Sequence, residues 1–456
     1  MEFANIFYVF AAVLFILGLK KLSHPKTARS GNTIAAAGMF IAIVATLIAY
    51  DQIDYHLIAV GMIIGTIIGA TFAIKVEMTQ MPQMVAIFNG FGGGASALVA
   101  AAEFLKTGDI TTFTLSTIMI SVFVGTLTFT GSFVAFGKLQ GFISGKPVVF
   151  PGQQIINGLL ALTLLFMGIY VVTTATEVNL FFGVISIAAI LGITLTIPIG
   201  GADMPVVISL LNSYSGIAAT ATGFVLMNNG LIISGSLVGA SGLILTNIMC
   251  KGMNRSLANV IFGAVGLEQE TTGSDGAKQM NVKSYSTEEA AMIFDAADKI
   301  IVVPGYGLAV AQAQHAVREV AEFLEAQQKQ VLYAIHPVAG RMPGHMNVLL
   351  AEANIPYEQL KDLDEINPEF EDCDVALVLG ANDVVNPAAR HDTSSPIYGM
   401  PILDVDKSRT VMINKRTMNP GFAGIQNELF GYENSIMIFG DAKDMLQQLL
   451  KDLKDL

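Results

Sequence analysis

The sequence predicts a polytopic α-helical membrane domain of about nine transmembrane helices, followed by a soluble α/β Rossmann-like domain with a doubly wound parallel sheet. A mean hydropathy of +0.58 and 53% hydrophobic residues are too high for an ordinary soluble chain of 456 residues. Charge is uneven, because residues 256–456 carry 29 of the 37 acidic and 15 of the 25 basic residues. In that second part, short apolar runs alternate with helical stretches. We therefore predict a membrane domain at 1–260, a linker at 261–284 and a second domain at 285–456.

The membrane spans are predicted from apolar runs, since a helix needs roughly 20 apolar residues to cross a bilayer. Nine of the ten Lys and Arg residues in the first 255 positions fall on one side of a nine-helix arrangement, and only Lys106 falls on the other. Basic residues favour the cytoplasmic side, so the N-terminus is expected outside and the acidic C-terminal part in the cytoplasm. No small-residue cleavage site follows the first run, so a signal peptide is not expected. The predicted spans are 3–19, 32–50, 56–74, 82–102, 112–135, 155–173, 179–199, 204–226 and 230–250.

The spans are rich in small residues, with Gly61, Gly65 and Gly69 at four-residue spacing and further groups at 92–96 and 234–242. Such faces predict close helix packing within the bundle, with a mobile or solvated pathway as the alternative. Well inside the nine runs there is no Lys, Arg or His. A proton carrier normally needs an intramembrane ionisable group. Either polar side chains carry the path here, or a partner chain supplies the titrating residue.

Composition also limits the partners of the second part. Its acidic excess makes nucleic acid an unlikely partner. The two cysteines, Cys250 and Cys373, match no metal-binding spacing and are expected to be reduced thiols. No metal site is therefore predicted.

The second domain is predicted to begin after a polar, Gly-containing connection at 264–284. A capping-box spacing at 286–289 predicts a helix over Ala290–Ala297. The last helix is expected over Ala442–Leu453. Between them, apolar runs separated mostly by helical stretches predict strands at 299–303, 331–335, 374–379, 409–413 and 435–439.

A glycine motif follows the first of these strands. Gly305-Tyr306-Gly307 lies where the strand meets a helix expected over Leu308–Gln327, which is the context of a dinucleotide fingerprint. Glycines there allow a tight turn and close approach to a pyrophosphate at a helix N-terminus. The third glycine position is Val310, so the motif alone fits either a nucleotide site or an ordinary Gly-rich turn.

The second strand indicates which ribose is bound. An NAD site usually has Asp or Glu there for the ribose 2′-hydroxyl, whereas this strand ends in His336 and Pro337. That difference favours a phosphorylated ribose. Lys415 and Arg416, after a later strand, offer two cations for a 2′-phosphate, although such a pair is also common as a solvated surface patch.

Several segments together resemble the beta subunit of proton-translocating NAD(P) transhydrogenase, over essentially the whole chain. The resemblance implies NADP(H) bound by this chain, NAD(H) bound by a partner alpha subunit, and direct hydride transfer between them coupled to inward proton movement that drives NADPH formation. It also implies a dimer of alpha–beta units in a bacterial cytoplasmic (inner) membrane. The segments are Gly201–Val207, Leu211–Gly216, Met249–Arg255, Val303–Gln314, His336–Asn347, Gly380–Asn386 and Lys415–Arg416.

The resemblance also assigns site residues. Asp383 is expected near the nicotinamide, coupling redox state to the membrane, and is the candidate catalytic residue; the alternative is a turn aspartate that caps a helix. Positioning, with no side chain as acid or base, is expected to account for hydride transfer. The expected cofactor-binding residues are Gly305, Tyr306, Gly307, Ala309, Val310, Val338, Ala339, Gly340, Arg341, Gly380, Ala381, Asn382, Asp383, Lys415 and Arg416.

The proton path carried over from the family includes Asn89, Asp203 and Asn228, the last two of which could equally be structural caps. Some family members have a His in the fourth span where this chain has Asn89. The chain is therefore similar to the branch whose protonatable His lies on a partner helix. Phe422 stands where a Tyr is common, which puts one cofactor hydrogen bond in doubt.

Two other classes of function remain possible from the residues. One is a secondary transporter or channel whose C-terminal domain only senses a dinucleotide. It predicts nucleotide binding without hydride exchange, and would more naturally carry an acidic residue after the second strand. The other is a structural membrane subunit with a degenerate nucleotide fold, which would not bind NADP⁺ at micromolar concentration.

Overall fold

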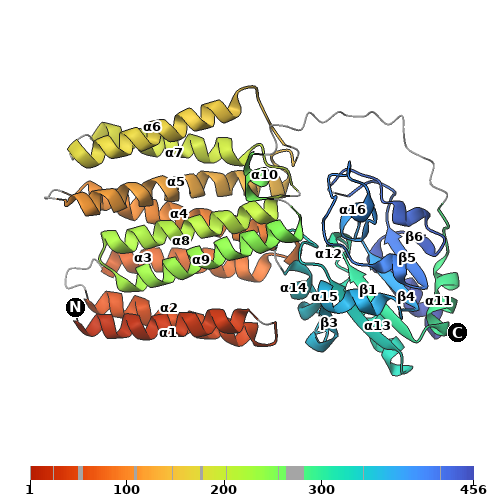
Figure 1. Ribbon diagram of the computed structural model, residues 1–456. Helices are drawn as coiled ribbons and strands as arrows, with labels where there is room; N and C mark the ends of the chain where they lie inside the picture. The colour runs from red at the N-terminus through yellow and green to blue at the C-terminus, as the bar shows by residue number, and fades with distance from the viewer. Residues whose placement is uncertain are drawn as a thin grey trace. The chain divides into compact units, whose positions relative to one another are not determined.

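The computed structural model describes residues 2–23, 25–49, 55–106, 110–145, 147–174, 178–201, 203–254, 256–262, 282–342, 344–421 and 423–456 (Figure 1). The chain divides into two compact units. The membrane unit comprises Met1–Asn247 with Leu257–Gly266, and the soluble unit comprises Ile248–Ser256 with Leu267–Leu456.

The predicted nine spans are confirmed. In the described part of the chain, nine helices are long and apolar enough to cross a membrane. The boundaries differ from the predicted runs by a few residues, because polar residues extend most helices at their ends. The helices are α1 (Glu2–Leu22), α2 (Pro25–Ala49), α3 (Tyr55–Lys75), α4 (Met81–Phe104), α5 (Thr112–Gln140), α6 (Gln153–Thr174), α7 (Val178–Thr196), α8 (Met204–Val225) and α9 (Asn229–Gly252), with a short α10 (Leu257–Phe262).

Helix α5 forms the centre of the membrane unit, packing against α4, α6, α7 and α8. It begins where the Thr111 side chain accepts the N–H of Thr114 and ends at Gly141, whose φ of +85° is in the left-handed region that favours glycine. Its apolar residues contribute to a core that includes Phe104, which stacks on Phe181 with ring centroids 4.0 Å apart.

Glycines bring several of these helices into backbone contact, which confirms the packing prediction for the groups at 92–96 and 234–242. A Cβ on Gly93 of α4 would lie 2.8 Å from Thr128 Cβ of α5, and one on Gly242 of α9 would lie 2.9 Å from Ser213 Cβ of α8. Real Cβ atoms do not approach so closely. The prediction is wrong for the glycines of α3, Gly61, Gly65 and Gly69, because no described residue lies within 4 Å of a Cβ built on any of them.

The soluble unit confirms the predicted doubly wound sheet. Six parallel strands lie in the order β3-β2-β1-β4-β5-β6, with Ile300 of β1 aligned with Val331 of β2 and Val375 of β4. The strands are β1 (Lys299–Pro304), β2 (Gln330–Ile335), β3 (Leu360–Asp362), β4 (Val375–Leu379), β5 (Thr410–Lys415) and β6 (Ser435–Phe439).

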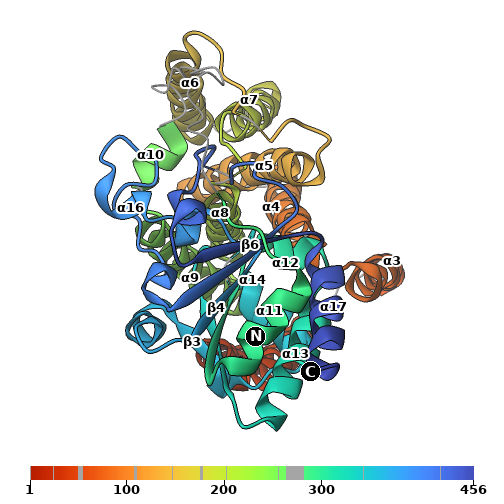
Figure 2. The ribbon, with the colours of Figure 1, turned by 90° about the vertical axis from the view of Figure 1, so that its right-hand side faces the viewer.

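Helices cover both faces of this sheet, because alternate residues of each strand point to opposite sides. On one side α11 (Thr287–Ala296), α13 (Gln314–Ala326) and α17 (Ala442–Lys454) pack together (Figure 2). On the other side Ile301 and Val378 pack in a core with Phe370 and Phe430. The predicted capping box is present at the start of α11, and the last helix is confirmed.

Two features of the soluble unit differ from the prediction. Strand β3 has only three residues, two of them charged, and pairs at the sheet edge, so it carries no apolar run. The helix expected over Leu308–Gln327 is two helices, α12 (Tyr306–Val310) and α13. Gln312 between them has a φ of +52°, which interrupts the helical conformation although its residue type does not signal a break.

Candidate functional site

The predicted nucleotide residues gather at the carboxyl edge of the sheet, where the strand order reverses. β1 and β4 are neighbours, but the chain leaves β1 towards β2 and leaves β4 towards β5, on opposite sides. Open α/β sheets bind ligands in the crevice at such a point. The loops that follow β1, β2, β4 and β5 carry the expected residues, so all four groups meet at this edge.

Glycines let the loops after β1 and β4 touch. Gly305 donates its N–H to Leu379 O at 2.9 Å, and Gly307 donates to Gly380 O at 3.0 Å. A Cβ on Gly307 would lie 2.6 Å from Gly380 Cα, and Gly380 itself has a φ of +66°. These glycines therefore serve a backbone-to-backbone contact at the switch point, which side chains would prevent.

The third position of the motif does not need glycine here. Ala309 of α12 is fully buried, whereas Val310 at the third position is 40% exposed. Because α12 ends at Val310, no long helix has to pack closely against β1 at that residue. This explains how the motif departs from the usual pattern without losing its turn.

The loop after β2 begins with a buried imidazole in place of a carboxylate. His336 Nδ1 accepts the N–H of Val338 at 3.2 Å, so Nε2 carries the proton and donates to Pro401 O at 2.8 Å. Burial lowers the pKa of His336 to about 4, although the Pro401 carbonyl opposes the shift. The ring is therefore neutral and bonded to the protein backbone.

A cation is held further along the same loop. The guanidinium carbon of Arg341 lies 4.4 Å from the centre of the Tyr306 ring. This cation–π contact joins the loop after β2 to the turn after β1. Burial raises the pKa of Tyr306, and the Arg341 charge opposes that shift.

A second cation comes from the end of β5. Lys415 Nζ donates to Asn419 O at 2.8 Å and to Asn382 Oδ1 at 3.3 Å, and lies 4.8 Å from the Phe430 ring centre. Burial lowers the pKa of Lys415, and the Asp383 carboxylate opposes that shift. Arg416 is exposed. Lys415 is thus fixed beside the loop after β4, as a phosphate-binding side chain would be.

Asp383 orders the segment that follows β5. Its carboxylate accepts the N–H of Ala423 at 3.0 Å and an Nδ2–H of Asn382 at 3.1 Å. A Cβ on Gly421 would lie 2.5 Å from Asp383 Oδ1, so the segment lies directly on the carboxylate. Asn382 occupies the N-cap position of the short 3₁₀ turn that begins at Asp383. Phe422 lies outside the described residues.

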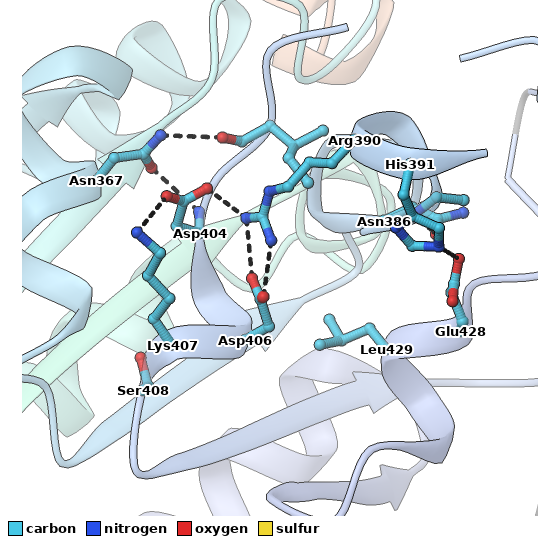
Figure 3. Close-up of polar contacts among 12 residues, drawn as sticks. Asn367, Asn386, Arg390, His391, Asp404, Asp406, Lys407, Ser408, Glu428 and Leu429 are labelled. Carbon is cyan, nitrogen blue, oxygen red and sulfur yellow. Dashed lines mark hydrogen bonds and ion pairs between the residues drawn. The ribbon is translucent and has the colours of Figure 1, made fainter. Parts of the chain in front are cut away.

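An ion-pair network supports the chain beyond Asp383 (Figure 3). Arg390 binds Asp406 through both terminal nitrogens, at 2.7 and 3.0 Å, and also pairs with Asp404. Lys407 pairs with Asp404 at 3.2 Å. This network ties the helical turn at 388–391 to the chain that leads into β5, as Figure 3 shows.

Sequence reasoning missed two buried asparagines that secure the same loops. Asn386 donates to Gln426 O at 3.1 Å, and Asn427 donates to Asn382 O at 2.9 Å. Both side chains are almost completely buried. Asn386 ends a segment on which the family resemblance rests, but no pattern in the sequence distinguishes Asn427 from other loop residues.

In the membrane unit, the three predicted proton-path residues have different surroundings. Asn89 is buried and donates to Ile208 O of α8 at 3.3 Å. Asp203 occupies the N-cap position of α8, but its side chain makes no capping hydrogen bond to that helix. Asn228 accepts the N–H of Leu231 at 3.1 Å, which caps α9, and also donates to the Tyr8 hydroxyl at 3.3 Å.

One charged residue of the membrane unit was overlooked. Lys138 was counted only among the cytoplasmic charges near span ends, but α5 continues past the predicted end at 135 and buries it to 5% exposure. Its ammonium donates to Ile197 O at 2.5 Å and Ile199 O at 2.8 Å, just beyond α7. A buried cation therefore satisfies carbonyls at the end of a span.

Comparisons with known proteins agree with this arrangement. The family model described as NAD(P) transhydrogenase beta subunit matches residues 4–452. Two relatives named NAD(P) transhydrogenase subunit beta are each 53% identical to this chain over 453 residues, which is 97% of this chain and 97% of the relative. One is from Rhodospirillum rubrum and the other from Rhodospirillum rubrum strain ATCC 11170. With nine spans among its described residues, a Rossmann-like domain and a match over nearly its full length, this chain belongs to the NAD(P) transhydrogenase beta-subunit family.

Proposed function

We propose that this chain binds NADP(H) and exchanges hydride directly with NAD(H) held by an alpha subunit, coupled to inward proton translocation that makes NADPH. Family membership implies nicotinamide dinucleotide binding and an alpha-subunit partner. The loops at the switch point of the soluble unit carry two cations, Arg341 after β2 and Lys415 at the end of β5. That arrangement suits a ligand with several phosphate groups.

The choice of NADP(H) over NAD(H) rests on one observation. The residue after β2, where a carboxylate would bind a ribose 2′-hydroxyl, is His336, whose two nitrogens are both used by backbone groups. Lys415, in contrast, is partly buried and fixed beside the loop after β4. We propose that Lys415 and Arg416 bind the 2′-phosphate.

The residues present fit the dinucleotide. Bare glycine backbone lies at the switch point, where a Cβ at Gly305, Gly307 or Gly380 would collide with the opposite loop. When bound, the cofactor supplies or accepts a hydride at its nicotinamide ring, which requires no side-chain acid or base. The chain's part is to orient and to exclude water. Gly305–Val310 would line the pyrophosphate, and Val338–Arg341 would approach it from β2.

Asp383 is proposed to couple the redox state of the nucleotide to the membrane unit. Its carboxylate accepts the N–H of Ala423 and lies against Gly421, and Lys415 precedes both residues. If a change in the redox state of the nucleotide moves these residues, the hydrogen bond from Ala423 to the Asp383 carboxylate changes as well. The coupling must be reciprocal. If protonation changes the affinity for NADP⁺ or NADPH, binding of that nucleotide must change the proton affinity by the same factor.

The membrane unit is proposed to carry the proton with help from a partner helix. The nine apolar helices in the described part of the chain and its family make it a multi-pass membrane protein. Asn89, Asp203 and Asn228 are proposed to lie along the path, with the titrating histidine on the alpha subunit. We further propose a dimer of alpha–beta units in a bacterial cytoplasmic membrane, with the N-terminus outside and the soluble unit in the cytoplasm.

Calorimetric titration of the whole chain in detergent tests this proposal. NADP⁺ and NADPH should bind tightly, while NAD⁺ and NADH should bind weakly at this site. Adding the alpha subunit should then give hydride exchange between NADPH and an NAD⁺ analogue. Binding of NADP⁺ without exchange would instead favour a transporter or channel whose soluble domain senses a dinucleotide, and no binding at all would favour a structural subunit.

A further inference from the structure

The loop that carries Arg341 is enclosed by two histidines with the same hydrogen-bonding role. His336 Nδ1 accepts the N–H of Val338, and His345 Nδ1 accepts the N–H of Arg341 at 3.0 Å. His345 is the first residue of α14 (His345–Glu352) and is 1% exposed. The loop that should meet the nucleotide is therefore fixed from a helix as well as from a strand.

The contact between this ring and the loop is close. Gly340 has a φ of +108°, and a Cβ there would lie 2.5 Å from His345 Nδ1 and 2.6 Å from His345 Cβ. Only glycine leaves room for the imidazole at that point. The ring of His345 also lies near Tyr306, with ring centroids 6.2 Å apart. His345 thus contacts the loop beside the guanidinium that lies over the same tyrosine.

The chemistry of the imidazole suits an acceptor. An Nδ1 that accepts an N–H must be unprotonated, so the ring is neutral with its proton on Nε2. Burial and the nearby Arg341 charge lower the pKa of His345 to about 4. The acceptor is therefore available throughout the physiological pH range.

We propose that His345 is a positioning residue for nucleotide binding: its Nδ1 holds the Arg341 backbone so that the guanidinium stays over the Tyr306 ring and faces the nucleotide. This inference rests on the proposed NADP(H) site. It differs from a ligand role for His345, in which Nε2–H would bind the nucleotide directly. Nε2 is buried and has no acceptor among the residues that the structure describes, so the two roles must be separated by experiment.

Substitution of His345 by asparagine or glutamine separates the positioning role from the ligand role, because each side chain places a polar atom near only one of the two ring nitrogens. In His345→Asn the Oδ1 atom takes about the position of Nδ1 and can accept the Arg341 N–H, whereas the amide of His345→Gln reaches the position of Nε2. The dissociation constant for NADP⁺ is measured by calorimetry on the whole chain in detergent. We expect His345→Ala and His345→Gln to weaken binding about tenfold and His345→Asn to change it less than about threefold, as loss of one buried hydrogen bond predicts.

Recovery by glutamine and not by asparagine would overturn the positioning role, and so would equal binding by all three variants. If His345→Ala does not fold, the asparagine and glutamine variants alone decide. Thermal unfolding of each variant shows whether it folds. Absence of NADP⁺ binding by the wild-type chain would overturn the proposed function itself, whereas normal wild-type binding with either of the first two results would overturn this inference alone.

A double-mutant cycle tests whether His345 acts through Arg341. Arg341→Ala removes the guanidinium, so adding His345→Ala to it should weaken NADP⁺ binding by less than about twofold. Fully additive losses would show that His345 acts independently of the Arg341 side chain and would overturn the proposal.

Two loop glycines provide a matched pair. Gly340→Ala combines a strained φ with a collision against His345, whereas Gly344→Ala has a φ of +67° and no described atom within 4 Å of its Cβ. Gly340→Ala should therefore weaken NADP⁺ binding several-fold more than Gly344→Ala. Equal losses would show that backbone strain alone matters, and would count against the imidazole contact.

Discussion

The two units satisfy their polar groups in different ways. In the soluble unit, charged side chains pair with each other, as in Lys299–Glu369 at 2.6 Å and Arg409–Asp374 at 2.8 Å. In the membrane unit, hydroxyl groups bond to one another and to backbone carbonyls, as where Ser121 and Thr222 lie 2.7 Å apart. Thr222 also donates to a carbonyl of α4 at 3.2 Å. Charged pairs are thus concentrated in the soluble unit, while the spans rely mainly on neutral donors.

Glycine serves the same purpose in both units, which makes it a sensitive probe of each. A Cβ on Gly125 of α5 would collide with the Gly93 carbonyl of α4, as a Cβ on Gly305 would collide with the backbone of Ala381. Both contacts bring backbone against backbone. The difference is in what they support: helix packing in a bilayer in one case, and the contact between the loops after β1 and β4 in the other.

Among single substitutions, the largest effect is expected at the glycine contact between α4 and α5. Gly125→Ala should destabilise the membrane unit by about 3 kcal/mol, because neither backbone can yield without moving a helix. The thermal unfolding midpoint in detergent measures this. Gly61→Ala is the control, since no described atom lies within 4 Å of its Cβ, and it should not lower the midpoint. Equal stability of the two variants would contradict the packing account.

Acid should destabilise the soluble unit through its buried histidines. Burial lowers the pKa of His336 and His345 from 6.5 to about 4. Below pH 6.5 the unfolded chain binds protons that the folded unit does not, so stability is complete above pH 6.5 and falls as the pH drops towards 4. Each histidine should lower the free energy of unfolding by up to about 1.4 kcal/mol for each pH unit in this range. Unfolding of the soluble unit followed by amide exchange between pH 7 and 4.5 measures this loss, and His345→Asn should reduce the slope.

Removing the buried cation of the membrane unit is the next test. Lys138→Met should cost about 2 kcal/mol, because the buried ammonium no longer donates to the carbonyls of Ile197 and Ile199, although Ile197 O keeps the longer bond from the Val148 N–H at 3.4 Å. Lys75→Met, at the exposed end of α3, is the matched control and should have no measurable effect. Thermal unfolding in detergent compares the two variants. An equal result for both would show that Lys138 serves only as an interfacial charge.

Sequence patterns sufficed for most of the fold because each element has a strong local signal. Apolar runs of span length predicted all nine membrane helices, and alternating apolar runs predicted five of the six strands. What failed has no local signal. Strand β3 is too short and too charged, and the break at Gln312 is a backbone conformation that its residue type does not require.

The sequence predicted which residues form the candidate site, but not the contacts that hold their loops in place. The motifs supplied Gly305, Arg341 and Lys415, and the sheet brings their loops to one edge. The contacts that fix those loops are long-range: Asn427 reaches Asn382 from 45 residues away. Such pairs depend on the folded topology, so spacing along the chain cannot reveal them.

An effect of similar size but greater selectivity is expected at the end of β5. Lys415→Ala should weaken NADP⁺ and NADPH binding about 30-fold, because a charge-assisted hydrogen bond to phosphate is worth about 2 kcal/mol. Any weak NAD⁺ binding should be unchanged, since that nucleotide lacks the 2′-phosphate. Calorimetry on the whole chain compares the four nucleotides. Equal losses for NADP⁺ and NAD⁺ would reject the phosphate role and point to the loss of the Asn382 and Asn419 contacts.

The smallest effect is expected at Asn89, and it tests where the proton carrier lies. Asn89→Ala should leave proton-coupled hydride transfer largely intact, because the side chain makes one long hydrogen bond, at 3.3 Å, and cannot titrate. The bond from Ser215 goes to the Asn89 backbone carbonyl at 2.8 Å and survives the substitution. Proton uptake by vesicles containing the alpha and beta subunits measures the coupling. Normal assembly with abolished pumping would place an essential step at Asn89 itself, and would contradict the proposal that a partner helix supplies the titrating group.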